Sequence, residues 1–197
     1  MTNLEQRLDE VIAKWSLLEH PFYRAWTMGT LPTGHLKLYA SEYASFIGMV
    51  AKGWEACGNS EIAEEEVEHY DLWKDFAKSL GHSDVVTNVS EVKELVSSCE
   101  RNYMNVNSAL GALYAFEKQQ PATAKSKLEG LRAHYQSLNA DETYFIVHEN
   151  DIEEPALLMD YMNKLNEKDQ EVALAACEEI CEKVYDALTG IMNAAEA

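Results

Sequence analysis

The sequence has few residues of the kinds that interrupt or cross-link a chain. Its 197 residues include 4 prolines, 9 glycines and 4 cysteines. The cysteines form no CxxC pair, and nothing in the sequence indicates a secreted protein in which disulfides would be favoured. We therefore expect reduced thiols. Cys177 and Cys181 share one helix face and are most simply small buried hydrophobic residues.

Basic residues are also scarce. There are 16 lysines and arginines against 34 acidic residues, which gives a formal net charge of -18. Such a chain repels a phosphate backbone and an anionic membrane surface, so nucleic acid and membrane are not expected partners. No stretch of eighteen apolar residues and no basic-then-apolar leader is present. We expect a cytoplasmic protein.

Runs of alternating β-branched residues, which build sheets, are absent too, whereas helical periodicity occurs almost everywhere. The pattern predicts an all-α bundle in which residues 1–197 form one domain, without repeats or linkers. Gly58 and Gly81 are expected to end helices, and Pro121 to bend or restart one. The predicted helices cover residues 4–18, 22–27, 33–57, 60–81, 90–103, 110–120, 125–135, 141 onward with an interruption at Pro155, and 168–193.

The predicted helix 60–81 carries polar groups on its apolar face. Turning each residue by about 100° places Glu66 and His69 in the sector of Trp73 and Phe76. Burying an unpaired carboxylate costs several kcal/mol, so an inward glutamate needs a cation or a hydrogen-bond network. The Glu66-x-x-His69 spacing is the one that carboxylate-bridged metal bundles use. Taken alone it is a weak signal, because a structural Glu–His hydrogen bond would satisfy both groups.

Two further segments place acids or imidazoles on apolar faces. Glu117 shares its face with Leu110 and Leu113, although a carboxylate near Pro121 that reaches the surface would explain it equally well. His148 lies on the face of Tyr144 and Phe145, and Asp151 follows three residues later. Mixed oxygen and nitrogen ligands from three helices suit iron or manganese better than zinc.

Four segments, read with these residues, resemble the haem-oxygenase-like superfamily of TenA-like, PqqC-like and CADD-like proteins. They span roughly residues 19–155, and the lysine block that ends in KLEGL is most similar to the CADD-like branch. The resemblance implies a seven-helix bundle with a central non-haem metal site, and a homodimer. The segments are HPFYRAWTMGTLPTGHLKLYASEYASF, HYDLWKDFAKSLG, ALYAFEKQQPATAKSKLEGLRAHY and YFIVHENDIEE.

The resemblance also implies a ligand set for a di-iron or iron–manganese centre. Glu66 and His69 match the Glu and His of one helix, Glu117 the lone Glu of another, and His148 the first His of a third. That third motif usually reads His-x-x-x-Asp-x-x-His. Here Asp151 follows one residue early and Glu154 stands in place of the last His. On a regular helix Glu154 would point about 120° away from His148, so it can join the site only if the helix breaks before Pro155.

Lys127 matches a lysine near the site of CADD-like proteins, some of which make 4-aminobenzoate from one of their own tyrosines. Tyr43 and Tyr114 are therefore candidate catalytic residues beside Lys127, with Tyr39 and Tyr144 of interest, although aromatic residues at helical spacing are more often core packing. The leading hypothesis is an O2-activating oxidase or oxygenase that acts on a small amino- or carboxylate-bearing molecule.

Two alternatives stay open at this point. One is a metal-free TenA-like hydrolase of thiamin-related pyrimidines, which needs a nucleophilic cysteine beside a carboxylate. The other is a non-catalytic binding protein that kept the bundle but lost a metal ligand, which the altered third motif would permit.

Overall fold

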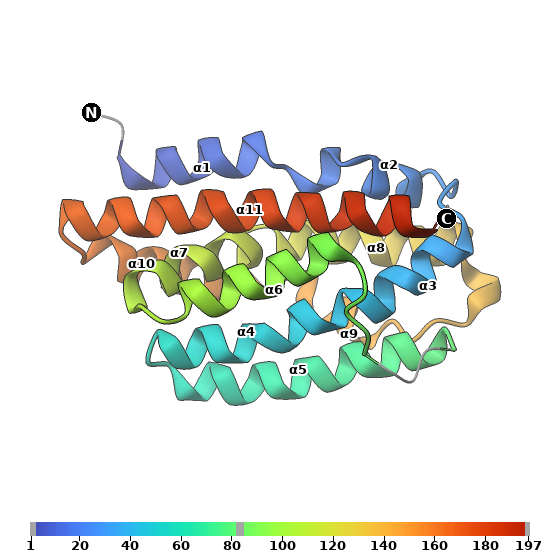
Figure 1. Ribbon diagram of the computed structural model, residues 1–197. Coiled ribbons are helices and arrows are strands. Elements are labelled where there is room, and N and C mark those ends of the chain that lie inside the picture. The colour runs from blue at the N-terminus through green and yellow to red at the C-terminus, as the bar shows by residue number, and fades with distance from the viewer. Residues whose placement is uncertain (1–2, 82–84, 196–197) are drawn as a thin grey trace.

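The computed structural model describes residues 3–81 and 85–195. Within these ranges the protein is all-helical, with eleven α-helices and two short 3-10 helices, Leu17–Glu19 and Gln136–Leu138 (Figure 1). The α-helices are α1 Leu4–Lys14, α2 Pro21–Thr27, α3 Thr33–Glu42, α4 Ala44–Ala56, α5 Ser60–Ser79, α6 Ser90–Asn102, α7 Val106–Glu117, α8 Gln120–His134, α9 Thr143–His148, α10 Glu153–Asn163 and α11 Glu167–Ala195.

The all-α prediction is confirmed. The nine stretches predicted as helical become eleven α-helices in the described residues because two of them are divided, so the segments outnumber the seven that the resemblance implies. The stretch 33–57 is split at Tyr43 into α3 and α4. There the Ser45 hydroxyl donates to the Glu42 carbonyl at 2.8 Å, a type of bond that bends helices. The stretch after 141 is split into α9 and α10. Gly58 ends α4 with a φ of 80°, as predicted, a conformation that glycine adopts without strain.

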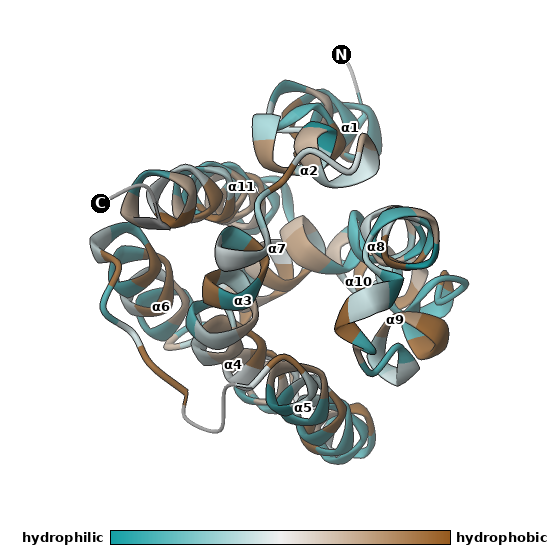
Figure 2. Ribbon diagram, turned by 90° about the vertical axis from the view of Figure 1, so that its right-hand side faces the viewer, coloured by the Kyte–Doolittle hydropathy of each residue, from teal (hydrophilic) through white to brown (hydrophobic). Residues whose placement is uncertain are grey.

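Helix α7 forms the centre of the bundle, and its residues from Ser108 to Glu117 are all buried. Seen along the bundle, α11 and α6 lie on one side of it and α8, α9 and α10 on the other (Figure 2). The long α11 packs against α7 so closely that a Cβ on Gly111 would lie 1.8 Å from the Ala173 carbonyl oxygen. Only glycine fits at that crossing.

Helix ends are fixed locally by side-chain caps. The Asn59 side chain accepts a hydrogen bond from the Ile62 amide at 3.3 Å and so starts α5, as the sequence predicts. Asn105 caps α7 in the same way through Asn107. Among the described helices, none is both long and apolar enough to cross a bilayer.

Candidate metal centre

Helix α5 presents Glu66 and His69 to the interior, as the helical sector predicts. Glu66 is 3 % exposed, and its Oε1 lies 2.8 Å from Nδ1 of His69. Burial by itself lowers the pKa of His69, but the hydrogen bond to Glu66 and the charges of Glu66, Glu154 and Asp151 outweigh burial and raise it. A Glu–His hydrogen bond is thus present, and the metal hypothesis depends on which further side chains contact Glu66 and His69.

His148 at the end of α9 meets this pair from the opposite helix. Glu66, His69 and His148 each offer a ligand atom, and all three atoms lie within 4.8 Å of one another. The two imidazole rings are 4.5 Å apart between centroids. Nδ1 of His148 bonds the Tyr144 carbonyl oxygen at 2.6 Å, which fixes the ring and leaves Nε2 as the free nitrogen. Burial lowers the pKa of His148 to about 4, so the imidazole is neutral, as a metal ligand must be.

Two more carboxylates complete the cluster. Glu117, 3 % exposed, lies at the end of α7, and Glu154, 7 % exposed, in the first turn of α10. The two side chains are hydrogen-bonded to each other, and the Trp54 indole N–H donates to Glu117 at 3.3 Å. The surface-reaching alternative for Glu117 is therefore wrong.

The break between α9 and α10 is what brings Glu154 inward. Residues 149–152 are non-helical, so the chain turns before Pro155, the condition under which Glu154 joins the site. Asp151 lies in this linker and is only partly buried. Its charge acts on His69 and Glu154, but it is outside the tight group of three ligand atoms.

The electrostatics of this cluster are compatible with a bound cation. Burial, followed by the charges of Glu154 and Glu66, raises the pKa of Glu117 well above its usual value. Burial, followed by the charges of Glu66 and Asp151, raises that of Glu154 to about 8. Like charges forced together in a low dielectric are stabilised by a metal ion, and carboxylate oxygens with imidazole nitrogens are the donor set that iron accepts. The residues present therefore fit an iron site.

Lys127 lies in a separate pocket of aromatic rings. It is 2 % exposed, and its Nζ is 5.3 to 5.9 Å from the ring centres of Tyr39, Tyr23 and Tyr43. Trp73 and Phe145 add two rings at 5.6 and 5.5 Å. Burial lowers the Lys127 pKa to about 7.

Two aromatic side chains join the lysine pocket to the metal cluster. Tyr144 stacks on His148 with 4.2 Å between ring centroids. Trp73 contacts Tyr144 edge-on at 4.8 Å and Tyr43 at 5.7 Å. The cluster and the pocket are thus neighbours in one interior site.

Of the two tyrosines singled out in the sequence, the structure brings only Tyr43 to Lys127. Tyr114 is buried on another face of α7, with Asp9 and Glu5 of α1 and Cys177 of α11 as electrostatic neighbours. The expectation that Tyr114 joins the Lys127 site is therefore corrected, because its helix position turns it toward α1 and α11.

Sequence reasoning missed Tyr23, Trp73 and Phe145 as neighbours of the lysine. Tyr23 stands in the quoted HPFY segment, and Trp73 shares the inward sector with Glu66 and His69. Their helical positions marked them as buried, but which interior group they would contact depends on how the helices pack.

The cysteines do not suit the hydrolase alternative. Burial raises the pKa of Cys57 and of Cys99 to about 12, and a hydrogen bond to Cys181, with burial, raises that of Cys177 well above its usual value. A nucleophilic cysteine needs the opposite shift.

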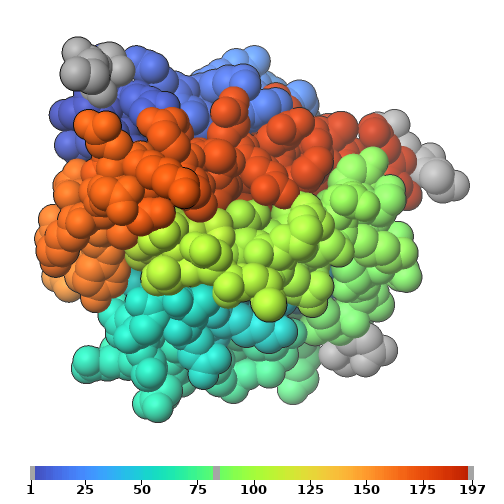
Figure 3. Space-filling model, turned by 60° about the vertical axis from the view of Figure 1, so that its left-hand side comes forward, coloured from blue at the N-terminus to red at the C-terminus, as the bar shows by residue number. Residues whose placement is uncertain are grey.

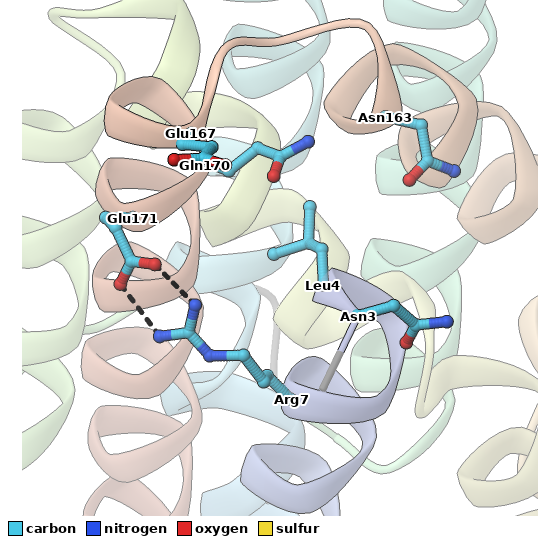
Figure 4. A pocket seen from close by; sticks show the side chains of 7 residues that line it. All are labelled: Asn3, Leu4, Arg7, Asn163, Glu167, Gln170 and Glu171. Carbon is cyan, nitrogen blue, oxygen red and sulfur yellow. Dashed lines mark hydrogen bonds and ion pairs between the residues drawn. The ribbon is translucent and has the colours of Figure 1, made fainter. Parts of the chain in front are cut away.

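Two surface hollows differ in their relation to the cluster. One, of about 490 Å³, lies between α1 and α11 and is crossed by the exposed ion pair of Arg7 and Glu171 (Figure 4). The other, of about 580 Å³, lies between α5 and α10 and reaches Glu154. Its acidic lining residues are Glu61, Glu65, Asp151, Glu153, Glu154 and Asp160. Of the residues at the candidate metal centre, Asp151 and Glu154 line this second hollow.

A helical bundle with an inward Glu-x-x-His pair and further buried carboxylates defines the class of non-haem carboxylate metalloproteins. The chain belongs to the family of iron-containing redox enzymes, whose model matches residues 24–182. It is an iron-dependent redox enzyme of that family.

Individual proteins agree with this placement. A 4-aminobenzoate synthase of Chlamydia muridarum is 30% identical over 98% of this chain and 92% of its own. A Shewanella denitrificans domain with a haem-oxygenase-like fold superposes with a TM-score of 0.80 at 17% identity, covering 100% of this chain and 94% of its own. A CADD-like protein of Nostoc punctiforme superposes with a TM-score of 0.67 at 16% identity, covering 98% and 94%. The predicted haem-oxygenase-like fold and CADD-like resemblance are confirmed.

Proposed function

We propose that this protein is an O2-activating oxidase or oxygenase with a two-metal centre, iron with iron or iron with manganese. The observation that carries the proposal is the convergence of Glu66, His69 and His148 within 4.8 Å, with Glu117 and Glu154 bonded to each other beside them. Bound iron would supply electrons to O2. Glu66, His69 and His148 would hold one metal, and Glu117 and Glu154, with Asp151 nearby, the other.

We further propose that the reaction is of the 4-aminobenzoate synthase type and that the protein acts on a small amino- or carboxylate-bearing molecule. The chemistry would lie at the Lys127 pocket, where an amine and three phenols meet within one dry volume. Since the Lys127 pKa is about 7, a large part of the amine is neutral near neutral pH, the form that can act as a nucleophile. Tyr23, Tyr39 and Tyr43 are the candidate reacting phenols.

The protein's own residues would prepare both parts of the site. The Tyr144 carbonyl holds His148 in one tautomer, and the Trp54 indole orients Glu117. Trp73 donates to the Ala40 carbonyl at 2.9 Å, which fixes its ring between Tyr144 and Lys127. The ring wall around Lys127 excludes water. The protein is further proposed to be a cytoplasmic homodimer.

Anaerobic reconstitution tests the proposal. The purified protein is loaded with Fe(II), alone or with Mn(II), and its metal content, O2 uptake and 4-aminobenzoate release are measured. Intact mass before and after turnover shows whether the protein itself loses atoms.

We expect about two metals per chain, O2 uptake and a released aromatic amine. Metal binding with O2 uptake but no aromatic amine would reject the synthase reaction alone. Metal content near zero, with no O2 uptake, would reject the whole proposal and favour the non-catalytic alternative.

A further inference from the structure

The Glu117 carboxylate has an oxidisable neighbour outside the Lys127 pocket. Trp54 of α4 is fully buried, and its indole N–H donates to Glu117 at 3.3 Å. Tryptophan and tyrosine are the side chains that lose one electron most readily. An indole bonded directly to a candidate metal ligand is thus placed to exchange electrons with the centre, and the carboxylate can accept the indole proton.

Tyr103 lies on the surface side of Trp54. A Cβ on Gly53, the residue before Trp54, would lie 2.8 Å from Cζ of Tyr103, so the phenol ring packs against the backbone beside Trp54. The Tyr103 hydroxyl is hydrogen-bonded to Cys99 and lies within electrostatic reach of Glu117. Tyr103 therefore stands between the interior and the end of α6.

Tyr103 also lines a surface groove. α4 and α6 pack side by side, and their cyan and yellow-green surfaces meet on the face drawn in Figure 3. The groove there has a volume of about 680 Å³, and its lining includes Met49, Lys52 and Met104. Met104 is 87 % exposed. Oxidisable side chains thus lie at both ends of this region, Trp54 at Glu117 and Tyr103 with Met49 and Met104 at the groove, and Tyr103 packs against Gly53, the backbone neighbour of Trp54.

We propose that Trp54 and Tyr103 carry single electrons between the groove and the metal centre, so that oxidising equivalents can leave the site without consuming the Lys127 pocket. With iron bound and oxidised by O2, Trp54 would supply one electron, and its indole N–H proton would pass to Glu117 along the hydrogen bond between them. Tyr103 would then give one electron to Trp54 and release its hydroxyl proton to solvent at the groove that it lines, while Glu117 returns the proton to the indole nitrogen of Trp54. An external ascorbate-type one-electron reductant at the groove would restore Tyr103 with one electron, and solvent would return the proton. The net change is one electron transferred from that reductant to the oxidised centre. This inference rests on the proposed iron site.

The test combines rapid freeze-quench electron paramagnetic resonance with metal analysis. Iron-loaded wild type, Trp54→Phe and Tyr103→Phe are mixed with O2, and the radical is assigned by ring-deuterated tyrosine. Tyr161→Phe is the matched control, because Tyr161 is likewise partly buried but lies on α10. Ascorbate serves as the external reductant.

We expect a tyrosyl radical in wild type and in Tyr161→Phe. Ascorbate should shorten the lifetime of this radical at least fivefold. Tyr103→Phe should shift the signal to a tryptophan radical that ascorbate does not affect, and Trp54→Phe should lower the Tyr103 radical at least fivefold. The same radical yield and decay in all four proteins, at equal iron content, would overturn the inference. Absence of iron in wild type would instead reject the metal site on which it rests.

Discussion

The candidate metal cluster and the Lys127 pocket are neighbours in one interior, yet their side chains differ in chemical type and in charge. The cluster gathers acids and imidazoles, and its like charges raise the pKa of Glu117 and Glu154. The pocket holds one amine among five aromatic rings, and burial lowers its pKa. Each group alone is costly to bury. The difference teaches that one interior lowers the cost of buried charge in two ways: acids and imidazoles bond to one another in the cluster, where we propose that a cation binds, and the amine of the pocket has a lowered pKa.

The largest expected effect falls on the cluster. Glu66→Gln keeps the size of the side chain but removes the charge that faces His69 and His148, so we expect metal content near zero and an activity loss of more than about 100-fold. Glu68→Gln on the same helix is the control, since Glu68 is exposed. Metal content by plasma emission spectroscopy and O2 uptake are the measurements. Equal metal binding by both variants would contradict the assignment of Glu66.

The variant Lys127→Met tests how much the buried amine of the Lys127 pocket costs in stability. Below pH 7 the folded protein buries a charged amine and bears the full cost. As pH rises from about 7 toward the unfolded value of 10.5, that cost disappears. The variant should therefore raise the free energy of unfolding of the metal-free protein by roughly 2 to 3 kcal/mol more at pH 6 than at pH 9.

Urea unfolding of the two proteins at both pH values measures this difference. Lys125→Met, on the exposed side of the same helix, should show no such pH dependence. A gain for Lys127→Met that does not change with pH would mean that the amine is not buried as an ion at low pH.

Glu154→Gln is expected to change stability in opposite directions in the metal-free and the iron-loaded protein. Because the pKa of Glu154 rises from 4.5 in the unfolded chain to about 8 in the fold, the carboxylate's cost to stability is absent below pH 4.5, grows between pH 4.5 and 8, and is fully present above pH 8. We expect the variant to stabilise the metal-free protein by roughly 2 kcal/mol at pH 8.5 and hardly at pH 4.5. With iron bound, the sign should reverse because a ligand is missing. Thermal unfolding with and without Fe(II) measures both, and a gain in the loaded protein would remove Glu154 from the ligand set.

The smallest effect is expected for the tyrosine outside the pocket. Tyr43→Phe should lower product formation at least tenfold if the pocket carries the chemistry, because one phenol beside Lys127 is lost. Tyr114→Phe should change it less than about twofold. Product quantification by mass spectrometry compares the two variants. Equal losses of product would contradict the assignment of the reaction to the Lys127 pocket rather than to the α1 side of the bundle.

The sequence by itself determined the all-α class, the helix limits at Gly58 and Asn59, and the inward faces of Glu66, His69 and His148, while it left Glu117 open between the interior and the surface. These follow from local periodicity and capping, which act within a few residues. Tertiary structure alone decided that Tyr43 rather than Tyr114 meets Lys127, that Tyr23 and Trp73 line the lysine pocket, and that Trp54 bonds Glu117. It also decided that the chain breaks at 149–152 so that Glu154 turns inward. A helix face is fixed by spacing along the chain, but its partner across the core depends on packing between distant segments, which no local pattern encodes.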